Sequence, residues 1–227
     1  MEKGPTPGAV LKKLKALGTA QNVKVYRRHG IDGPLYGVSF AHLSALAKSL
    51  GQNHGLAVKL WASGNHDARV LATMIADASA MTSAGLDRWA KALDNYVIAD
   101  AFSKLVRTSP LVRSKVAAWT KSSNDWLGQV GWSLVAFLAL SEVSLSESEF
   151  SRYIETIERS IHAGKNRTRY AMNSALIAIG VRSARLKLKA LEAAARIGTV
   201  TVDHGPTGCK TPDARQYIIK SWNRRMA

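Results

Sequence analysis

Apolar residues recur three and four positions apart along almost the whole chain, which is the spacing of an α-helix that buries one face. Proline and glycine interrupt this pattern at intervals, and only Val200-Thr201-Val202 looks extended. The pattern predicts an all-α protein. The expected helices cover residues 9–28, 40–50, 55–62, 66–77, 86–106, 110–121, 125–140, 167–179, 184–197 and 212–224, with a further helix that starts at Ser146.

The helix that starts at Ser146 has the clearest local signal. Ser146-Glu147-Ser148-Glu149 has the form of a capping box, in which serine and glutamate side chains each accept a backbone N–H of the other residue. The apolar stripe that follows consists of Phe150, Tyr153, Ile154, Ile157 and Ile161. We expect this stripe in the core and the acidic face of the helix in solvent.

Short helices with a single apolar stripe do not close a core alone, so we expect antiparallel pairs stacked into a curved helical-repeat solenoid with a concave basic groove. A closed helical bundle is the competing packing. We expect residues 1–227 to form one domain, with a flexible start at residues 1–8 and a loop plus final helix at 198–227. The tryptophans Trp89, Trp119 and Trp132 lie among apolar neighbours and are predicted to be core residues.

The net charge of the chain indicates the kind of partner that the protein binds. The 227 residues contain 32 Lys plus Arg against 16 Asp plus Glu, a formal net charge of +16. Such an excess favours a polyanion, and nucleic acid first, because each phosphate that a cation neutralises releases condensed counterions. Between residues 159 and 227 there are 14 basic residues and three acids, so this C-terminal third is expected to face phosphate.

Several function classes have no residues to support them. No run approaches the roughly 18 apolar residues of a membrane span, and the first residues do not resemble a signal peptide, so we expect a cytoplasmic protein that joins the nucleoid when bound to DNA. The one cysteine, Cys209, forms no internal disulfide. The chain has no HExxH, P-loop, GxGxxG or nucleophile-elbow motif, and no cofactor is predicted.

Two short segments contain residue types that can bind a metal ion. The loop from Asp203 to Asp213 contains one His, one Cys and two carboxylates, but a structural turn is the favoured interpretation and no metal site is predicted. His66-Asp67 fits a helix start better than a ligand pair.

The strongest candidate for phosphate binding is the predicted helix start at Asn166. Lys165, Arg167 and Arg169 surround it, so that cationic side chains and backbone N–H groups are expected to converge on one phosphate. Arg182, Arg185 and Lys187 begin the following helix and are expected to extend the track along the duplex. The alternative is a solvated cationic face that serves solubility.

The candidate for catalysis is Asp100, in the segment Asp94-Asn95-Tyr96-Val97-Ile98-Ala99-Asp100. Tyr96 and Asp100 are four residues apart and share one face of a helix. A carboxylate beside an aromatic ring on a basic protein is suited to stabilise positive charge that develops on a nucleic-acid sugar. The alternative is an aspartate that caps a helix or pairs with an arginine.

Four segments together resemble one known family. They are Gly37-Val38, Leu60-Trp61-Ala62-Ser63-Gly64-Asn65-His66-Asp67-Ala68-Arg69, Asp94-Asn95-Tyr96 with Asp100, and Trp126-Leu127-Gly128-Gln129. In order and spacing, residues 10–195 resemble the bacterial DNA alkylation repair proteins built from HEAT-like helical repeats. The resemblance implies a concave basic surface that grips duplex DNA, and a glycosylase that removes cationic N3- or N7-alkylated purines without a deep base pocket.

The resemblance also assigns roles by position, and two of them are altered here. It places the catalytic aspartate at Asp100 and the aromatic sugar contact at Tyr96, where active members usually have tryptophan. The arginine of active members falls on Gln129, after Trp126, and their second cleft tryptophan falls near Ser174. Trp126 is equally consistent with a core anchor and a DNA contact, and Gln129 offers a phosphate hydrogen bonds without charge.

Two hypotheses follow for a monomer that binds double-stranded DNA. In the first, the protein is an alkylpurine DNA glycosylase, with Asp100 as the catalytic residue. In the second, it is a non-catalytic binder of damaged, bent or branched DNA that keeps the same scaffold. A protein-binding helical scaffold is a third possibility, which the charge excess disfavours.

Overall fold

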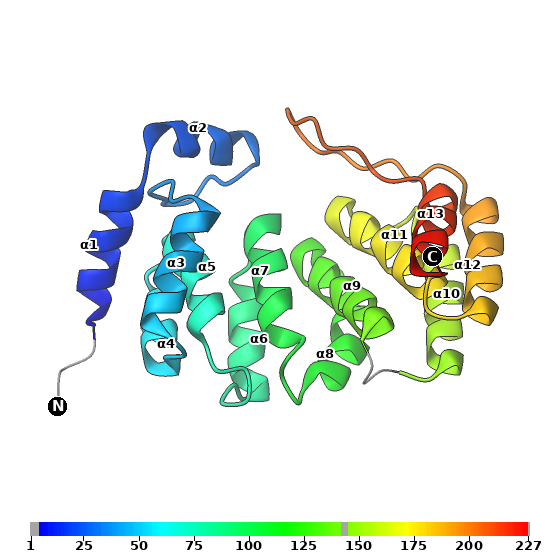
Figure 1. The fold of residues 1–227 in the computed structure, drawn as a ribbon, viewed down its shortest axis with the longest axis horizontal. Helices are drawn as coiled ribbons and strands as arrows, with labels where there is room; N and C mark the ends of the chain where they lie inside the picture. The colour runs from blue at the N-terminus through cyan, green and yellow to red at the C-terminus, as the bar shows by residue number, and fades with distance from the viewer. Residues whose placement is uncertain (1–4, 142–144, 227) are drawn as a thin grey trace. The chain divides into compact units, whose positions relative to one another are not determined.

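The computed structural model describes residues 5–141 and 145–226 (Figure 1). Of the flexible start expected at residues 1–8, residues 1–4 lie outside the described residues. In the described part of the chain every regular element is a helix, so the all-α prediction is confirmed and Val200-Thr201-Val202 forms no strand. Each of these helices is too short or too polar to cross a membrane.

The chain divides into two compact units. Unit 1 comprises residues 1–111 with 205–207, and unit 2 comprises residues 112–204 with 208–227. The helices of unit 1 are α1 (Pro7–Leu17), α2 (Ala20–Arg28), α3 (Phe40–Leu50), α4 (His54–Ala62), α5 (His66–Ile75), α6 (Ser83–Lys91) and α7 (Tyr96–Val106). The helices of unit 2 are α8 (Val112–Trp119), α9 (Asp125–Leu140), α10 (Glu147–Ser160), α11 (Asn166–Gly180), α12 (Ala184–Ile197) and α13 (Ala214–Met226).

Two segments predicted as single helices each form two helices. The predicted helix over 9–28 is interrupted at Gly18, where a Cβ would lie 2.1 Å from the carbonyl oxygen of Tyr36, and Thr19 starts α2 by accepting the N–H of Asn22 at 3.2 Å. The predicted helix over 86–106 is interrupted before Asn95, whose side chain caps α7 by accepting the N–H of Ile98 at 3.0 Å. Both interruptions use a capping side chain at the new helix start.

The capping box at Ser146 is confirmed. The Ser146 hydroxyl accepts the Glu149 N–H at 3.2 Å, and the Glu149 carboxylate accepts the Ser146 N–H at 2.8 Å. The Ser146 N–H and then the Ser146 hydroxyl, which also donates to this carboxylate at 2.8 Å, stabilise its charged form and lower the pKa of Glu149. The predicted apolar stripe is buried except for Tyr153, which is half-buried.

Helix α5 is the centre of unit 1. It packs against α3, α4 and α7, and nine of its ten residues are buried, including the polar side chains of His66, Asp67 and Arg69. Beside it, the rings of Trp61 and Trp89 stack with centroids 4.1 Å apart. The core position predicted for Trp89 is therefore confirmed.

In unit 2, α9 packs closely against both α8 and α11. Glycines in α9 permit this approach: a Cβ on Gly128 would lie 2.3 Å from the Thr168 hydroxyl oxygen, and one on Gly131 would lie 2.6 Å from the Trp119 carbonyl carbon. Trp119 and Trp132 are buried, as predicted.

The buried imidazole of His66 predicts a pH-dependent stability. Burial lowers the pKa of His66 below its ordinary value of 6.5, although the charges of Asp67 and Asp94 oppose this shift. The unfolded chain therefore binds a proton more readily than the folded chain below about pH 6.5. The free energy of unfolding should fall as the pH drops through this range, and His66→Gln should make that decline shallower.

Urea unfolding at about pH 7.5 and about pH 5.5 measures this effect in the wild type and the variant. The exposed His42 of α3 offers the matched control, and His42→Gln should keep the wild-type decline. Equal declines in the wild type and His66→Gln would contradict the prediction.

Candidate nucleic-acid interface

Helix α7 presents Asp100 to the outside of unit 1. The apolar side chains of Ile98 and Phe102 face the core, which leaves Asp100 exposed on the opposite side of the helix. Tyr96 lies one turn earlier and is half-buried. Tyr96 and Asp100, which the sequence analysis pairs, therefore lie on one helix at the expected spacing of one turn.

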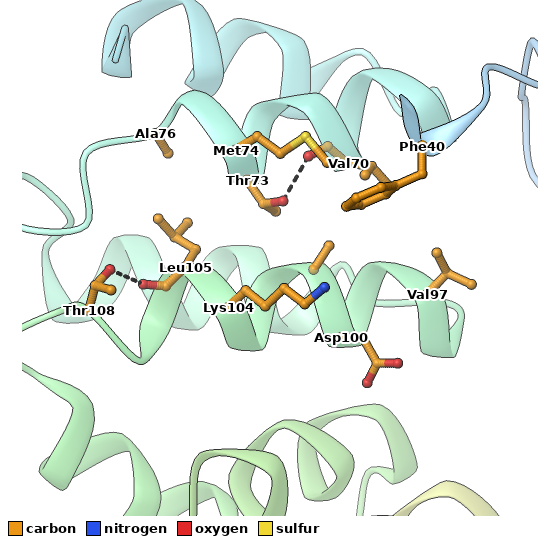
Figure 2. Close-up of a pocket in the computed structure, with 11 residues that line it drawn as sticks. Phe40, Val70, Thr73, Met74, Ala76, Val97, Asp100, Lys104, Leu105 and Thr108 are labelled. Carbon is orange, nitrogen blue, oxygen red and sulfur yellow. Dashed lines mark hydrogen bonds between the residues drawn. The ribbon is translucent and has the colours of Figure 1, made fainter. Parts of the chain in front are cut away.

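Asp100 also borders a pocket of about 530 Å³ between α5 and α7, closed at one end by Phe40 at the start of α3 (Figure 2). Asp100 lies at the edge of this pocket, and its carboxylate points away from α5 (Figure 2). Lys104, one turn further along α7, is exposed and runs along the pocket.

Tyr96 is held from a second helix. Its hydroxyl forms a short hydrogen bond with Nδ1 of His29, which follows the last residue of α2. Sequence reasoning did not pair these two residues, which are 67 positions apart. The bond ties the tyrosine hydroxyl to the end of α2.

Gly37-Val38 and Asp67, which belong to the motifs that resemble the family, help to hold helix α2 in place. The buried carboxylate of Asp67 accepts the backbone N–H groups of Tyr36, Gly37 and Val38 at 2.6, 3.2 and 2.9 Å. His66 and Asp67 begin α5, so their prediction as a helix start is confirmed.

Helix α2 has no fully buried residue. Hydrogen bonds from its side chains attach it to the backbone of Gly37 and Val38. The Asn22 side chain donates to Gly37 O at 3.0 Å, and the Tyr26 hydroxyl donates to Val38 O at 2.6 Å. Burial, and then the charge of Asp67, raise the pKa of Tyr26. A chain of contacts thus runs from Asp67 through α2 to Tyr96.

The motif residues Arg69 and Asp94 hold the turn before α7. Nη1 of the buried Arg69 lies 2.8 Å from the Asp94 carboxylate, and the guanidinium also bonds the Ala92 carbonyl and covers the Trp61 ring at 4.6 Å. The other Asp94 oxygen accepts the Asn95 side chain at 2.7 Å. These residues set the start of α7, and with it the direction of Asp100.

The predicted phosphate site at the start of α11 differs from expectation. The helix does begin at Asn166, but the N–H groups of Arg167 and Thr168 donate to the Asp125 carboxylate at 3.1 and 2.7 Å. An internal carboxylate therefore occupies the place expected for a phosphate, because an anion at a helix N-terminus is stabilising whichever chemical group supplies it.

Two of the predicted cationic side chains bind backbone carbonyls. Arg169 donates to Thr201 O at 2.8 Å and Gly164 O at 2.9 Å. Arg182 donates to Ala139 O at 2.8 Å and Ser141 O at 2.9 Å. Both guanidinium groups hold chain segments together within unit 2, so part of their hydrogen-bonding capacity is used inside this unit.

The remaining predicted basic residues are nearer the surface. Lys165 and Arg185 are exposed. Arg167 lies with its guanidinium carbon 4.9 Å from the centre of the Tyr170 ring, and Lys187 has its ammonium 4.8 Å from the centre of the Trp222 ring. Both contacts are of the cation–π kind.

The altered family positions do not form an exposed cluster on unit 2. Gln129 is 1% exposed, so its side chain is not available on the surface of this unit. Ser174 is half-buried, and its hydroxyl donates to Tyr170 O at 3.1 Å. Trp126 is also half-buried.

Sequence reasoning missed a cationic surface at the start of the chain. Residues 5–31 contain no acidic residue. The six basic residues of this segment are exposed on α1 and α2: Lys12, Lys13, Lys15, Lys24, Arg27 and Arg28. The absence of acidic residues from 5–31 was the sequence feature that indicated this surface. It was overlooked because the excess of basic residues is larger in the C-terminal third.

The loop after α12 has the contacts of a structural turn. The His204 ring contacts Thr211 Oγ1 at 3.0 Å and meets the Tyr170 ring edge-on at 5.6 Å. Within the described residues, no group of three or more His, Cys, Asp or Glu side chains is arranged to hold a metal ion.

Comparison with known proteins identifies the class of fold and then the family. A solved structure, described as a new family of proteins related to the HEAT-like repeat DNA glycosylases with affinity for branched DNA structures, has a TM-score of 0.89 and 29% identity, covering 97% of this chain and 95% of that chain. The fold is therefore HEAT-like. Uncharacterized proteins of Listeria monocytogenes serovar 1/2a and Listeria innocua serovar 6a are each 30% identical over 223 residues, 93% of this chain and 95% of each relative. Residues 10–218 match the family model described as DNA alkylation repair enzyme, and the chain belongs to this family.

Proposed function

We propose that this protein binds DNA and recognises branched structures in preference to linear duplex. The observation that carries the proposal is the similarity, over nearly the whole chain, to a solved structure described as having affinity for branched DNA. The net charge of +16 supports it, because a polyanionic partner gains from counterion release. The expected concave basic groove, the monomeric state and an association with the nucleoid belong to the same proposal.

The exposed cations of α1 and α2 supply a surface for phosphates. A branch point brings the phosphates of several strands close together, so a protein with many exposed cations gains more phosphate contacts there than on one duplex. Phosphate contacts fix position and carry no base sequence, in agreement with the absence of a base-reading motif.

Fluorescence anisotropy with a fully paired four-way junction and a linear duplex of the same length and composition tests this function. We expect the junction to bind at least about tenfold more tightly, and log affinity to fall with log salt by about 0.9 per phosphate contact. Replacing Lys12, Lys13 and Lys15 together by Gln should reduce this slope by almost three. Equal affinity for junction and duplex would overturn the proposal.

A second candidate function is the excision of cationic N3- or N7-alkylated purines. The observation that favours it is the exposed carboxylate of Asp100, one turn from Tyr96 and at the edge of a pocket. An N7-alkylated purine leaves readily because it is already cationic, so a carboxylate near the sugar and a water that attacks C1′ suffice in principle. The buried Gln129, at the position where active relatives have arginine, weighs against a fast reaction.

A further inference from the structure

We infer that the pocket between α3, α5 and α7 of unit 1 receives one unpaired nucleobase of the branched DNA. This inference rests on the proposed function and adds to it the chemical group that is recognised. All the residues that line the pocket belong to unit 1, so the site is complete within that unit.

The walls of the pocket are apolar. Val70 of α5 and Ala76, the residue that follows this helix, line one side of it, and Leu105 of α7 lines the other (Figure 2). The two threonines in the walls donate their hydroxyl groups to nearby backbone: Thr73 of α5 donates to Val70 O at 2.7 Å, and Thr108, just after α7, donates to Leu105 O at 2.8 Å. The walls therefore offer van der Waals contact to a flat apolar surface and no strong hydrogen bond.

Phe40 supplies an aromatic surface at one end of this pocket. It is the first residue of α3, after the capping Ser39, and its side chain is 59% exposed. Helix α3 turns Leu43 and Leu46 to the core instead, so Phe40 is not needed for packing. An exposed aromatic ring beside an apolar pocket is the arrangement that binds single bases by stacking, because every base has a π-face.

Lys104 adds a cation to the same site. Its ammonium nitrogen lies 5.5 Å from the centre of the Phe40 ring and is carried on the exposed side of α7. A base that stacks on Phe40 would bring its own phosphate within reach of this ammonium group. The pairing of an aromatic ring with a cation distinguishes a nucleotide from an uncharged apolar ligand.

The size of the pocket sets the selectivity. At about 530 Å³ it falls within the range of small-molecule sites and admits a single purine or pyrimidine. A paired base is excluded because its partner and the stacked neighbours block the approach, so only a base already released from pairing enters at low cost. A branch point with an unpaired base meets this condition.

The test uses two four-way junctions, one fully paired and one with a single unpaired 2-aminopurine at the branch point. The wild type should quench the 2-aminopurine fluorescence, as stacking on an aromatic ring does, and should bind this junction more tightly than the paired one. Phe40→Ala should abolish the quenching and weaken binding of the unpaired junction about tenfold, leaving the paired junction unaffected. Phe40→Trp should restore both.

Val58→Ala on α4 is the matched control, because it also shortens an exposed apolar side chain of unit 1 and should change nothing. If the wild type binds both junctions equally and Phe40→Ala alters neither, the pocket does not take a base, and the branched-DNA function stands. Quenching that persists in Phe40→Ala would also overturn the inference. Failure to bind either junction would overturn the proposed function itself.

Discussion

Replacing Asp67 by alanine should lower the free energy of unfolding by about 4 kcal/mol, because two buried N–H groups and one part-buried N–H group lose a charged acceptor at once. The Asp67 side chain is fully buried and receives the backbone donors of Tyr36, Gly37 and Val38. A bond to a charged group contributes about 1.5–3 kcal/mol, and the three share one side chain, so their sum is not additive. Urea unfolding of wild type and variant measures the difference.

Asp32→Ala provides the control for this change. Asp32 is an exposed aspartate in the same connection between α2 and α3, so the same chemical change there should leave stability almost unaltered. Asp67→Asn should lie between the two, since the amide keeps one acceptor oxygen and loses the charge. A loss below about 1 kcal/mol in Asp67→Ala would show that the segment is held by other contacts.

The second large effect concerns catalysis. If the second candidate function holds, Asp100→Asn should release 7-methylguanine from alkylated duplex DNA on the order of 10²–10³-fold more slowly than the wild type, the loss expected when a group that stabilises transition-state charge is removed. The side chain is exposed and its substitution is isosteric, so the fold and the affinity for DNA should be preserved. Chromatography of the released base gives the rate, and anisotropy on the same DNA gives the affinity.

Tyr96→Phe separates the ring from the hydroxyl in this reaction. The variant removes the hydrogen bond to His29 and keeps the aromatic surface, so most of the base release should survive if the ring edge contacts the sugar. Asp32→Asn, an exposed carboxylate elsewhere in unit 1, should retain the full rate. Equal release by wild type and Asp100→Asn would exclude Asp100 as the catalytic residue.

The helix pattern could be predicted from the sequence because apolar spacing reports burial directly. The two interruptions in it were missed for a local reason. The apolar stripe continues across Gly18-Thr19 and across Asp94-Asn95, so periodicity alone joins helices that capping side chains separate. Thr19 and Asn95, both strong capping residues, were the available signal.

The environment of the candidate site could be predicted only in part. Tyr96 and Asp100 were paired correctly because four residues in one helix fix their relation. The binding of the Asp125 carboxylate at the N-terminus of α11 was not predictable, because the two segments lie more than 40 residues apart. The local sequence around Asn166 is the same whether the bound anion is a phosphate or an internal carboxylate. The carbonyl contacts of Arg169 and Arg182 were hidden for the same reason.

The bonding of Asp67, Arg69 and Asp94 has a consequence for how relatives are sorted. Each of these three side chains holds a backbone segment or a turn in place. Asp100, the exposed acid of α7, is not one of them. Selection for a stable fold is enough to retain them, whether or not the protein excises bases. We therefore expect Asp67, Arg69 and Asp94 to be kept in relatives with and without base-excision activity, so their presence alone does not indicate catalysis.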